Sequence, residues 1–355
     1  DRDVPTYLRA YAIARSVFRA HPQHPGAAHY LIHAVDDPAH AAMGLDAARA
    51  YSRIAPDAAH AQHMTSHIFI ALGMWDDVIA ANLRAQQPSQ SGRRPPYGHG
   101  AQWLIYGYLQ EGRIARASGW LDSVRVLADH LRNDPDARDE LEPMIRSYLA
   151  LDRAAYVADT RAWRSPFATM EIDTAGFGVH DAAANDLAIG MSALGRGERA
   201  RADSAFARMR ARNVRATAVA QGASSDLGYA QVMEQVMRAM LLHADRQSDS
   251  AVATLALAAT LDDSLPFAFG PPVEIVSPHE LAGEYLLESG RASDAKREYT
   301  HALARAPGRT AALLGLAKAQ MALGQKAAAR RTYLLAAKNL VGADSGAAPE
   351  LARTH

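Results

Sequence analysis

The sequence predicts an all-α fold, an α-solenoid in which antiparallel helix pairs stack one after another into a superhelix. Three observations predict it. A pattern of small and aromatic residues recurs near the C-terminus, the alanine-rich chain has 49% hydrophobic side chains, and strand signals are absent apart from the short run Pro272–Val276. Internal recurrence of this kind is typical of repeat folds, in which each unit packs against the next.

The first predicted helix, Val4–Ala20, has the pattern of the second helix of a pair whose first helix is missing. His-rich repeats follow over residues 25–112, and a further weak copy of the pattern lies near Gly197. Between Met144 and Gly190 we expect helix pairs without a good repeat match. Proline and glycine break helices, and they mark loops at Arg93–Gly100, Ser165–Asp181 and Ser264–Pro278.

The clearest repeats occupy residues 276–309 and 310–341. Their pattern is carried by Gly290, Ala295 and Tyr299, which return 34 residues later as Gly324, Ala329 and Tyr333. Small residues suit the close crossing of two helices, and the aromatic ring fills the space between repeats. The pattern resembles the tetratricopeptide repeat, a helix–turn–helix unit of about 34 residues. This resemblance implies a non-enzymatic scaffold that binds a protein or peptide.

We therefore expect one solenoid over residues 1–341, in which each repeat contacts only its neighbours, and a short tail at 342–355. Neither end shows a polar capping helix. There are two alternative explanations. Either a cap has been trimmed away, or copies of the chain associate head to tail into a homo-oligomer or filament.

Composition excludes several classes of protein. The chain has 38 basic and 38 acidic residues, so it lacks the field that attracts nucleic acid. It has no cysteine, which excludes disulfides, thiolate metal sites and thiol catalysis. No apolar run is long enough for membrane insertion. Because the sequence starts at Asp1, we expect a trimmed product, with a secreted or periplasmic location slightly favoured, and the arginine-rich composition suggests a bacterium.

Histidines form the main candidate site. His29 and His33 are four residues apart, as are His63 and His67, so each pair lies on one face of a helix. The two pairs are 34 residues apart, which is the repeat period, so they are expected to lie side by side on the first helices of adjacent repeats. Asp36 and Asp37 are expected to face the same groove, and so are His60 and His99.

Imidazole and carboxylate together suit a divalent metal ion such as zinc, copper or nickel. The predicted ligands are His29, His33, His63, His67, Asp36 and Asp37. A groove for an anionic or aromatic ligand and a buried hydrogen-bond network are the alternatives. The segment also resembles, in HPGAAHYLIHAVDDP and HAQHMTSHIF, a set of bacterial tetratricopeptide proteins, which implies no secure activity.

A second candidate is the carboxylate stripe formed by Glu280, Glu284 and Glu288. Like charges at this spacing repel, and calcium or a basic peptide would relieve the repulsion. A solvated helix face is the alternative. Near it, Gly283 stands where an HExxH zinc motif needs its second histidine. The function favoured by these patterns is a scaffold with a metal site in its groove, and the alternative is a metal-dependent hydrolase or oxidoreductase.

Overall fold

The computed structural model describes residues 3–87, 98–220, 222 and 224–345. Within these ranges the chain is helical, with seventeen α-helices, one 3₁₀ turn and no β-strand. The helices of the first part are α1 (Val4–Ala20), α2 (Pro25–Ala34), α3 (Leu45–Ile54), α4 (Ala59–Ala71), α5 (Trp75–Ala85), α6 (His99–Gln110), α7 (Ile114–Arg132), α8 (Leu141–Thr160) and α9 (Pro166–Thr169), with the 3₁₀ turn at Ala41–Gly44. Those of the second part are α10 (Val179–Gly195), α11 (Arg199–Val219), α12 (Ser225–Ala244), α13 (Ser248–Ser264), α14 (Pro278–Glu288), α15 (Ala292–Arg305), α16 (Thr310–Ala322) and α17 (Lys326–Asn339).

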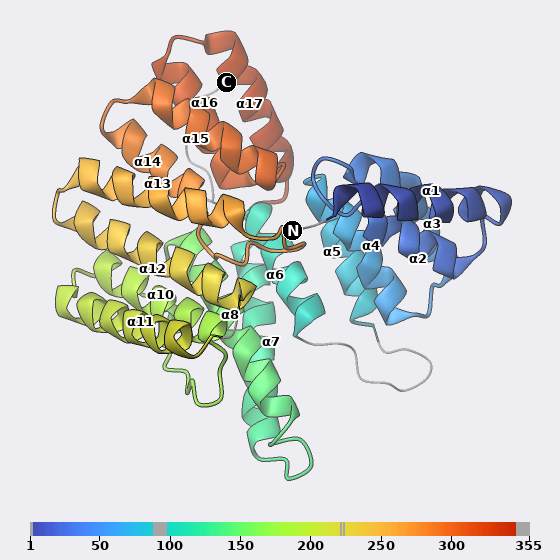
Figure 1. The fold of residues 1–355 in the computed structure, drawn as a ribbon, viewed down its shortest axis with the longest axis horizontal. Coiled ribbons are helices and arrows are strands. Elements are labelled where there is room, and N and C mark those ends of the chain that lie inside the picture. The colour runs from blue at the N-terminus through green and yellow to red at the C-terminus, as the bar shows by residue number, and fades with distance from the viewer. Residues whose placement is uncertain (1–2, 88–97, 221, 223, 346–355) are drawn as a thin grey trace.

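Consecutive helices pack against each other along the whole chain, which confirms the predicted solenoid. Helices α1–α5 form one lobe, on the right of Figure 1, and α8–α17 form a larger curved stack on the left, with α6 and α7 between them. No helix in the described ranges has both the length and the apolar character that a membrane crossing needs.

The small and aromatic residues of the last repeats pack as their pattern predicts. A Cβ atom on Gly283 would lie 2.8 Å from the Tyr299 ring, and one on Gly315 would lie 2.2 Å from it. The Tyr299 ring is therefore held between α14 and α16, where only glycine leaves enough room. Gly290 ends its helix in the left-handed region, with φ of 75°, a conformation that glycine adopts without strain.

The middle of the chain differs from the expected helix pairs. Helix α8 is a single long helix, followed only by the four residues of α9 and an irregular segment up to Gly178. It packs against α6, α7 and α10, so its neighbours supply the contacts that a paired helix would otherwise make. The weak strand signal at Pro272–Val276 also gives no strand, and these residues belong to the irregular loop between α13 and α14.

The expectation that each repeat contacts only its neighbours is wrong. The turn at Pro307–Gly308, between α15 and α16, packs against Gly73 in the turn between α4 and α5. In the same region the backbone N–H and the hydroxyl of Thr310 donate hydrogen bonds to the side-chain and backbone oxygens of Gln110 at the end of α6. Asp344 accepts a hydrogen bond from the backbone N–H of Ala115. The superhelix thus folds back, and its last repeats contact its first lobe.

The buried side chain of Arg309 also connects the last repeats with earlier helices. Its guanidinium group is 4% exposed and donates hydrogen bonds to Asp159 at 2.6 Å, to Glu280 at 2.7 Å and to the Tyr106 hydroxyl at 3.1 Å. These partners come from α8, α14 and α6, so one side chain connects three helices that are far apart in sequence.

Candidate metal centre

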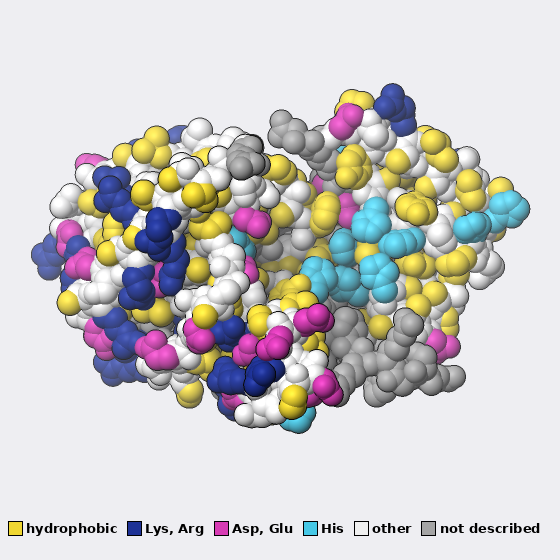
Figure 2. All heavy atoms as spheres, turned by 60° about the horizontal axis from the view of Figure 1, so that its bottom comes forward, with side chains coloured by type: hydrophobic (Ala, Val, Ile, Leu, Met, Phe, Trp, Pro, Cys, Tyr) yellow, Lys and Arg dark blue, Asp and Glu magenta, His cyan; other side chains and the backbone are white. Residues whose placement is uncertain are grey.

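Six histidines from three helices form one continuous cluster. His29 and His33 come from α2, His60, His63 and His67 from α4, and His99 from the start of α6. Ring centroids lie 4.8 Å apart for His29 and His33, 5.2 Å for His29 and His60, 5.7 Å for His33 and His67, 5.3 Å for His63 and His67, and 4.7 Å for His63 and His99. Figure 2 shows histidine side chains gathered in one patch on this face of the molecule.

His63 has a defined tautomer. Its Nδ1 atom lies 2.7 Å from Oδ1 of Asn82 on α5, while the amide nitrogen of Asn82 donates to the carbonyl oxygen of Val78. Because that bond orients the amide, its oxygen faces the imidazole, and Nδ1 must be the donor. The proton-free nitrogen is then Nε2, which is buried and has no hydrogen-bond partner. A bare, buried nitrogen of this kind is suited to metal ligation.

His67 is oriented by a carboxylate. Its Nδ1 atom lies 3.2 Å from Oδ2 of Asp36, in the loop that follows α2. Both side chains are almost completely buried, at 6% exposure for His67 and 1% for Asp36. A carboxylate that accepts from one ring nitrogen makes the other nitrogen a better metal ligand. The pair therefore has the arrangement found around metal-bound histidines.

The Trp103 ring packs against three histidines of the cluster. Its ring centroid lies 4.6 Å from that of His67, 4.9 Å from that of His63 and 5.6 Å from that of His99. The loop between α13 and α14 covers the other side of the indole, since a Cβ atom on Gly270 would lie 2.7 Å from it. The histidines are thus backed by a rigid apolar surface that limits their movement.

Burial keeps the cluster neutral. It lowers the pKa of His63 to about 3, with a further contribution from His67, and lowers the pKa of His99 to about 4. Desolvation also lowers the pKa of His29 to about 4, and it lowers the pKa of His67, although Asp36 opposes that change. Metal binding requires neutral imidazole, so at pH 7 these rings need not lose a proton first.

Among the residues that the structure describes, two groups have ligand atoms close enough to hold an ion. They are His63, His67 and His99, and His33, Asp36 and His67, and within each group the ligand atoms lie within 4.8 Å of one another. Three protein ligands leave a fourth coordination position for water or another group, as in catalytic zinc sites.

Other predicted residues lie outside these groups. Asp37 lies 2.8 Å from Nδ1 of His40 and accepts hydrogen bonds from two backbone N–H groups of its own turn. His29 and His60 belong to the ring cluster but not to either group of ligands. His60 contacts His29, whereas His99 lies beside His63.

Two carboxylates of the stripe on α14 already pair with arginines of this chain, and the third lies beside a histidine. Glu280 pairs with Arg309, Glu284 with Arg161, and Glu288 lies 3.2 Å from Nε2 of His243. The two arginines thus relieve part of the repulsion between these carboxylates. All three line a cavity of about 320 Å³ between α8 and α14, whose apolar walls include Trp163 and Met240.

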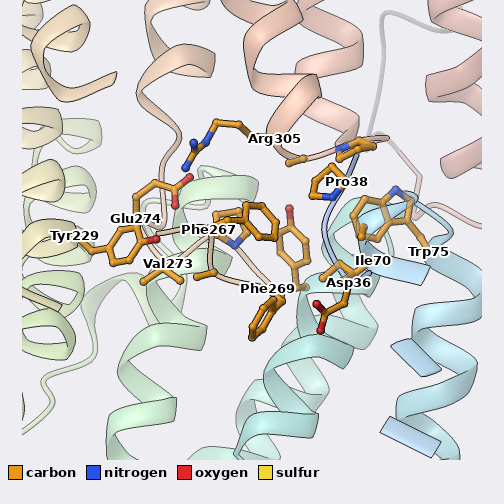
Figure 3. Close-up of a pocket in the computed structure, with 17 residues that line it drawn as sticks. Asp36, Pro38, Ile70, Trp75, Tyr229, Phe267, Phe269, Val273, Glu274 and Arg305 are labelled. Carbon is orange, nitrogen blue, oxygen red and sulfur yellow. The ribbon is translucent and has the colours of Figure 1, made fainter. Parts of the chain in front are cut away.

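Sequence reasoning missed three features of the site: Asn82, Trp103 and the loop at Phe269. An asparagine inside a helix, between Ala81 and Leu83, was a signal for Asn82, because a buried amide needs partners. The Phe269 ring lies 5.9 Å from that of His67, and Asp36 and Phe269 both line a cavity of about 60 Å³ beside the cluster (Figure 3).

Comparison with known proteins agrees with the helix-pair architecture. Residues 286–342, which extend from the end of α14 to just beyond α17, match the model of a tetratricopeptide repeat family. Residues 286–342 therefore form tetratricopeptide repeats. No curated protein matches the sequence.

Proposed function

We propose that this protein is a tetratricopeptide repeat scaffold whose first repeats bind a divalent transition-metal ion, with zinc the best fit. The ligands are Nε2 of His63, His67 and His99, and Asn82 and Asp36 orient the first two. The observation that carries the proposal is the bare Nε2 of His63, which is buried and held in place by the Asn82 hydrogen bond.

The donor set favours zinc. Three neutral imidazoles without a thiolate suit zinc, copper(II) or nickel rather than copper(I) or calcium. His63 and His67 lie on α4 and His99 on α6, so a bound ion would connect the first helices of two repeats. In a scaffold this ion would stiffen the repeats that present a binding surface.

The test is metal content. Purified protein is dialysed against Zn²⁺, washed and analysed for bound zinc, in parallel with His63→Ala, His99→Ala and the exposed control His130→Ala. We expect wild type and the control to retain zinc and the two cluster variants to lose at least one ion per chain. Absence of zinc from the wild type, with copper(II) and nickel also absent after the same dialysis, would refute the proposal.

The partner that we propose for the scaffold is a peptide with apolar and basic side chains. The cavity beside the α14 carboxylates supports this choice, because its walls are apolar and the carboxylates line it. The Glu284 and Glu288 side chains are 28% and 52% exposed, so they remain accessible although Arg161 and His243 lie beside them. We expect a library of basic peptides to bind the wild type and to bind the Glu284→Gln, Glu288→Gln double variant more weakly. Equal binding by wild type and variant refutes this assignment.

End-to-end association is the second part of the partner proposal. Ile13 and Tyr30 are exposed on α1 and α2, and they line an apolar cavity of about 500 Å³ at the N-terminal end. Leu334 is exposed on α17, the last helix of the described chain. We expect sedimentation to show concentration-dependent assembly that Ile13→Ser abolishes. A monomer at all concentrations would refute this part alone.

A further inference from the structure

His67 is the only residue common to both potential ligand groups in the described part of the chain. Its Nδ1 atom faces Asp36, and its ring centroid lies 5.3 Å from that of His63 and 5.7 Å from that of His33. A histidine in this position can offer each ring nitrogen to a different ion.

We infer that the cluster is a dinuclear centre, in which the imidazole ring of His67 bridges two divalent ions. The inference rests on the proposed function and extends it with a second ion, held by His33 Nδ1, Asp36 Oδ2 and His67 Nδ1. The first ion remains at His63, His99 and the Nε2 atom of His67.

The distances around Asp36 fit a second ion. Its Oδ2 atom lies 3.2 Å from His67 Nδ1 and 3.5 Å from His33 Nδ1. Hydrogen bonds between charged nitrogen and carboxylate oxygen are shorter, about 2.7–2.9 Å. Two ligands of a tetrahedral zinc ion with ordinary bond lengths are separated by about 3.3 Å. Two of the three atom pairs thus already have about the spacing of neighbouring ligands in a coordination tetrahedron.

The proton and half of the ionic charge are also accounted for. When the second ion binds, His67 Nδ1 releases to solvent the proton that it now donates to Asp36, and the ring becomes an imidazolate. This anion and the Asp36 carboxylate supply two negative charges next to the two ions. The His33 side chain is 41% exposed, so the second ion would have access to water.

The second ion would also extend the connection between repeats. His33 and Asp36 belong to α2 and its following loop, His67 to α4, and the first ion reaches His99 on α6. A bridged pair would therefore join the first helices of three consecutive repeats.

Counting zinc in four proteins tests the inference. We expect two zinc ions per chain in the wild type, one in His33→Ala, one in His99→Ala and none in His67→Ala. One ion in the wild type would overturn the second site while leaving the proposed function intact, whereas none would refute both. Loss of only one ion in His67→Ala would overturn the bridge.

Copper(II) gives a readout that does not depend on folding of the His67 variant. Two copper ions joined by one imidazolate are magnetically coupled, so the wild type loaded with two equivalents should show a spin signal well below its total copper content. His33→Ala and His99→Ala, with one ion each, should show the full signal for their copper. An uncoupled signal from two copper ions in the wild type would overturn the bridge.

Discussion

The indole N–H of Trp75 donates a hydrogen bond of 3.0 Å to the carbonyl oxygen of Gly308, 233 residues further along the chain. Trp75 begins α5, and Gly308 lies in the turn before α16. Solenoids are stabilised mainly by contacts between neighbouring repeats, whereas this bond belongs to an additional interface that joins the two ends of the superhelix.

The glycine turn at this interface gives the first prediction. Gly73 and Gly290 both have positive φ, 66° and 75°, so an alanine at either position costs about 1–2 kcal/mol of backbone strain. At Gly73 the new Cβ atom would also lie 2.5 Å from the carbonyl oxygen of Pro307, whereas nothing lies within 4 Å at Gly290. Overpacking should cost Gly73→Ala about 1–3 kcal/mol more. Urea unfolding measures the difference, and equal losses in the two variants would contradict the role of the interface.

Removal of Arg309 should be strongly destabilising. Its loss leaves Asp159 and Glu280 without a buried counter-charge, and breaking a buried ion pair from one side costs about 3–5 kcal/mol. We expect Arg309→Met to lower the free energy of unfolding by that amount. In contrast, Arg201→Met removes only an exposed pair with Glu171 and should cost less than about 1 kcal/mol. Similar values for the two variants in chemical denaturation would argue against a buried network.

Asn82 offers a test of how His63 is positioned. Asn82→Leu removes the acceptor of the His63 Nδ1 proton, and loss of such a partner weakens metal binding by about 10- to 100-fold. Asn82→Asp retains an acceptor and should restore the affinity. Titration calorimetry with Zn²⁺ measures both, and unchanged affinity in Asn82→Leu would show that the tautomer does not matter.

Stability should decrease in acid because the histidines are buried. In the unfolded chain they bind protons near pH 6.5, whereas the folded pKa is about 3 for His63 and about 4 for His29. Below pH 6.5 the unfolded state therefore binds more protons, and the stability that is fully present above this pH is lost as the pH falls towards 3. The double variant His29→Gln, His63→Gln should show a shallower decrease in unfolding free energy between pH 6.5 and 4. An unchanged slope would mean that these rings are already solvated.

The repeat period predicted the fold and part of the candidate site. It placed His33 beside His67, and their rings do lie 5.7 Å apart. It also placed His29 beside His63, but His29 contacts His60 and His63 contacts His99. A sequence period gives equivalent positions on neighbouring helices, while the crossing of those helices decides which turns actually meet. That crossing depends on packing against α3, α5 and the loop at Gly270, which the period does not contain.

The closing interface could not be predicted for a related reason. Pro307 and Gly308 look like an ordinary turn between repeats, and Gly73 looks like another. Their contact depends on the accumulated curvature of all the helices between them. Small deviations from regular geometry at each repeat, such as the long helix α8, change where the two ends of the superhelix lie relative to each other.

The fold-back at Gly308 also affects the order in which the protein can be completed during synthesis. A linear array of repeats can assemble as it leaves the ribosome, because each unit needs only the one before it. Here Trp75 leaves the ribosome 233 residues before Gly308, so the face of the first lobe that packs against Gly308 is uncovered until then. The contacts of Trp75 and Tyr106 with Gly308 and Arg309 therefore form only after the last third of the chain has been translated.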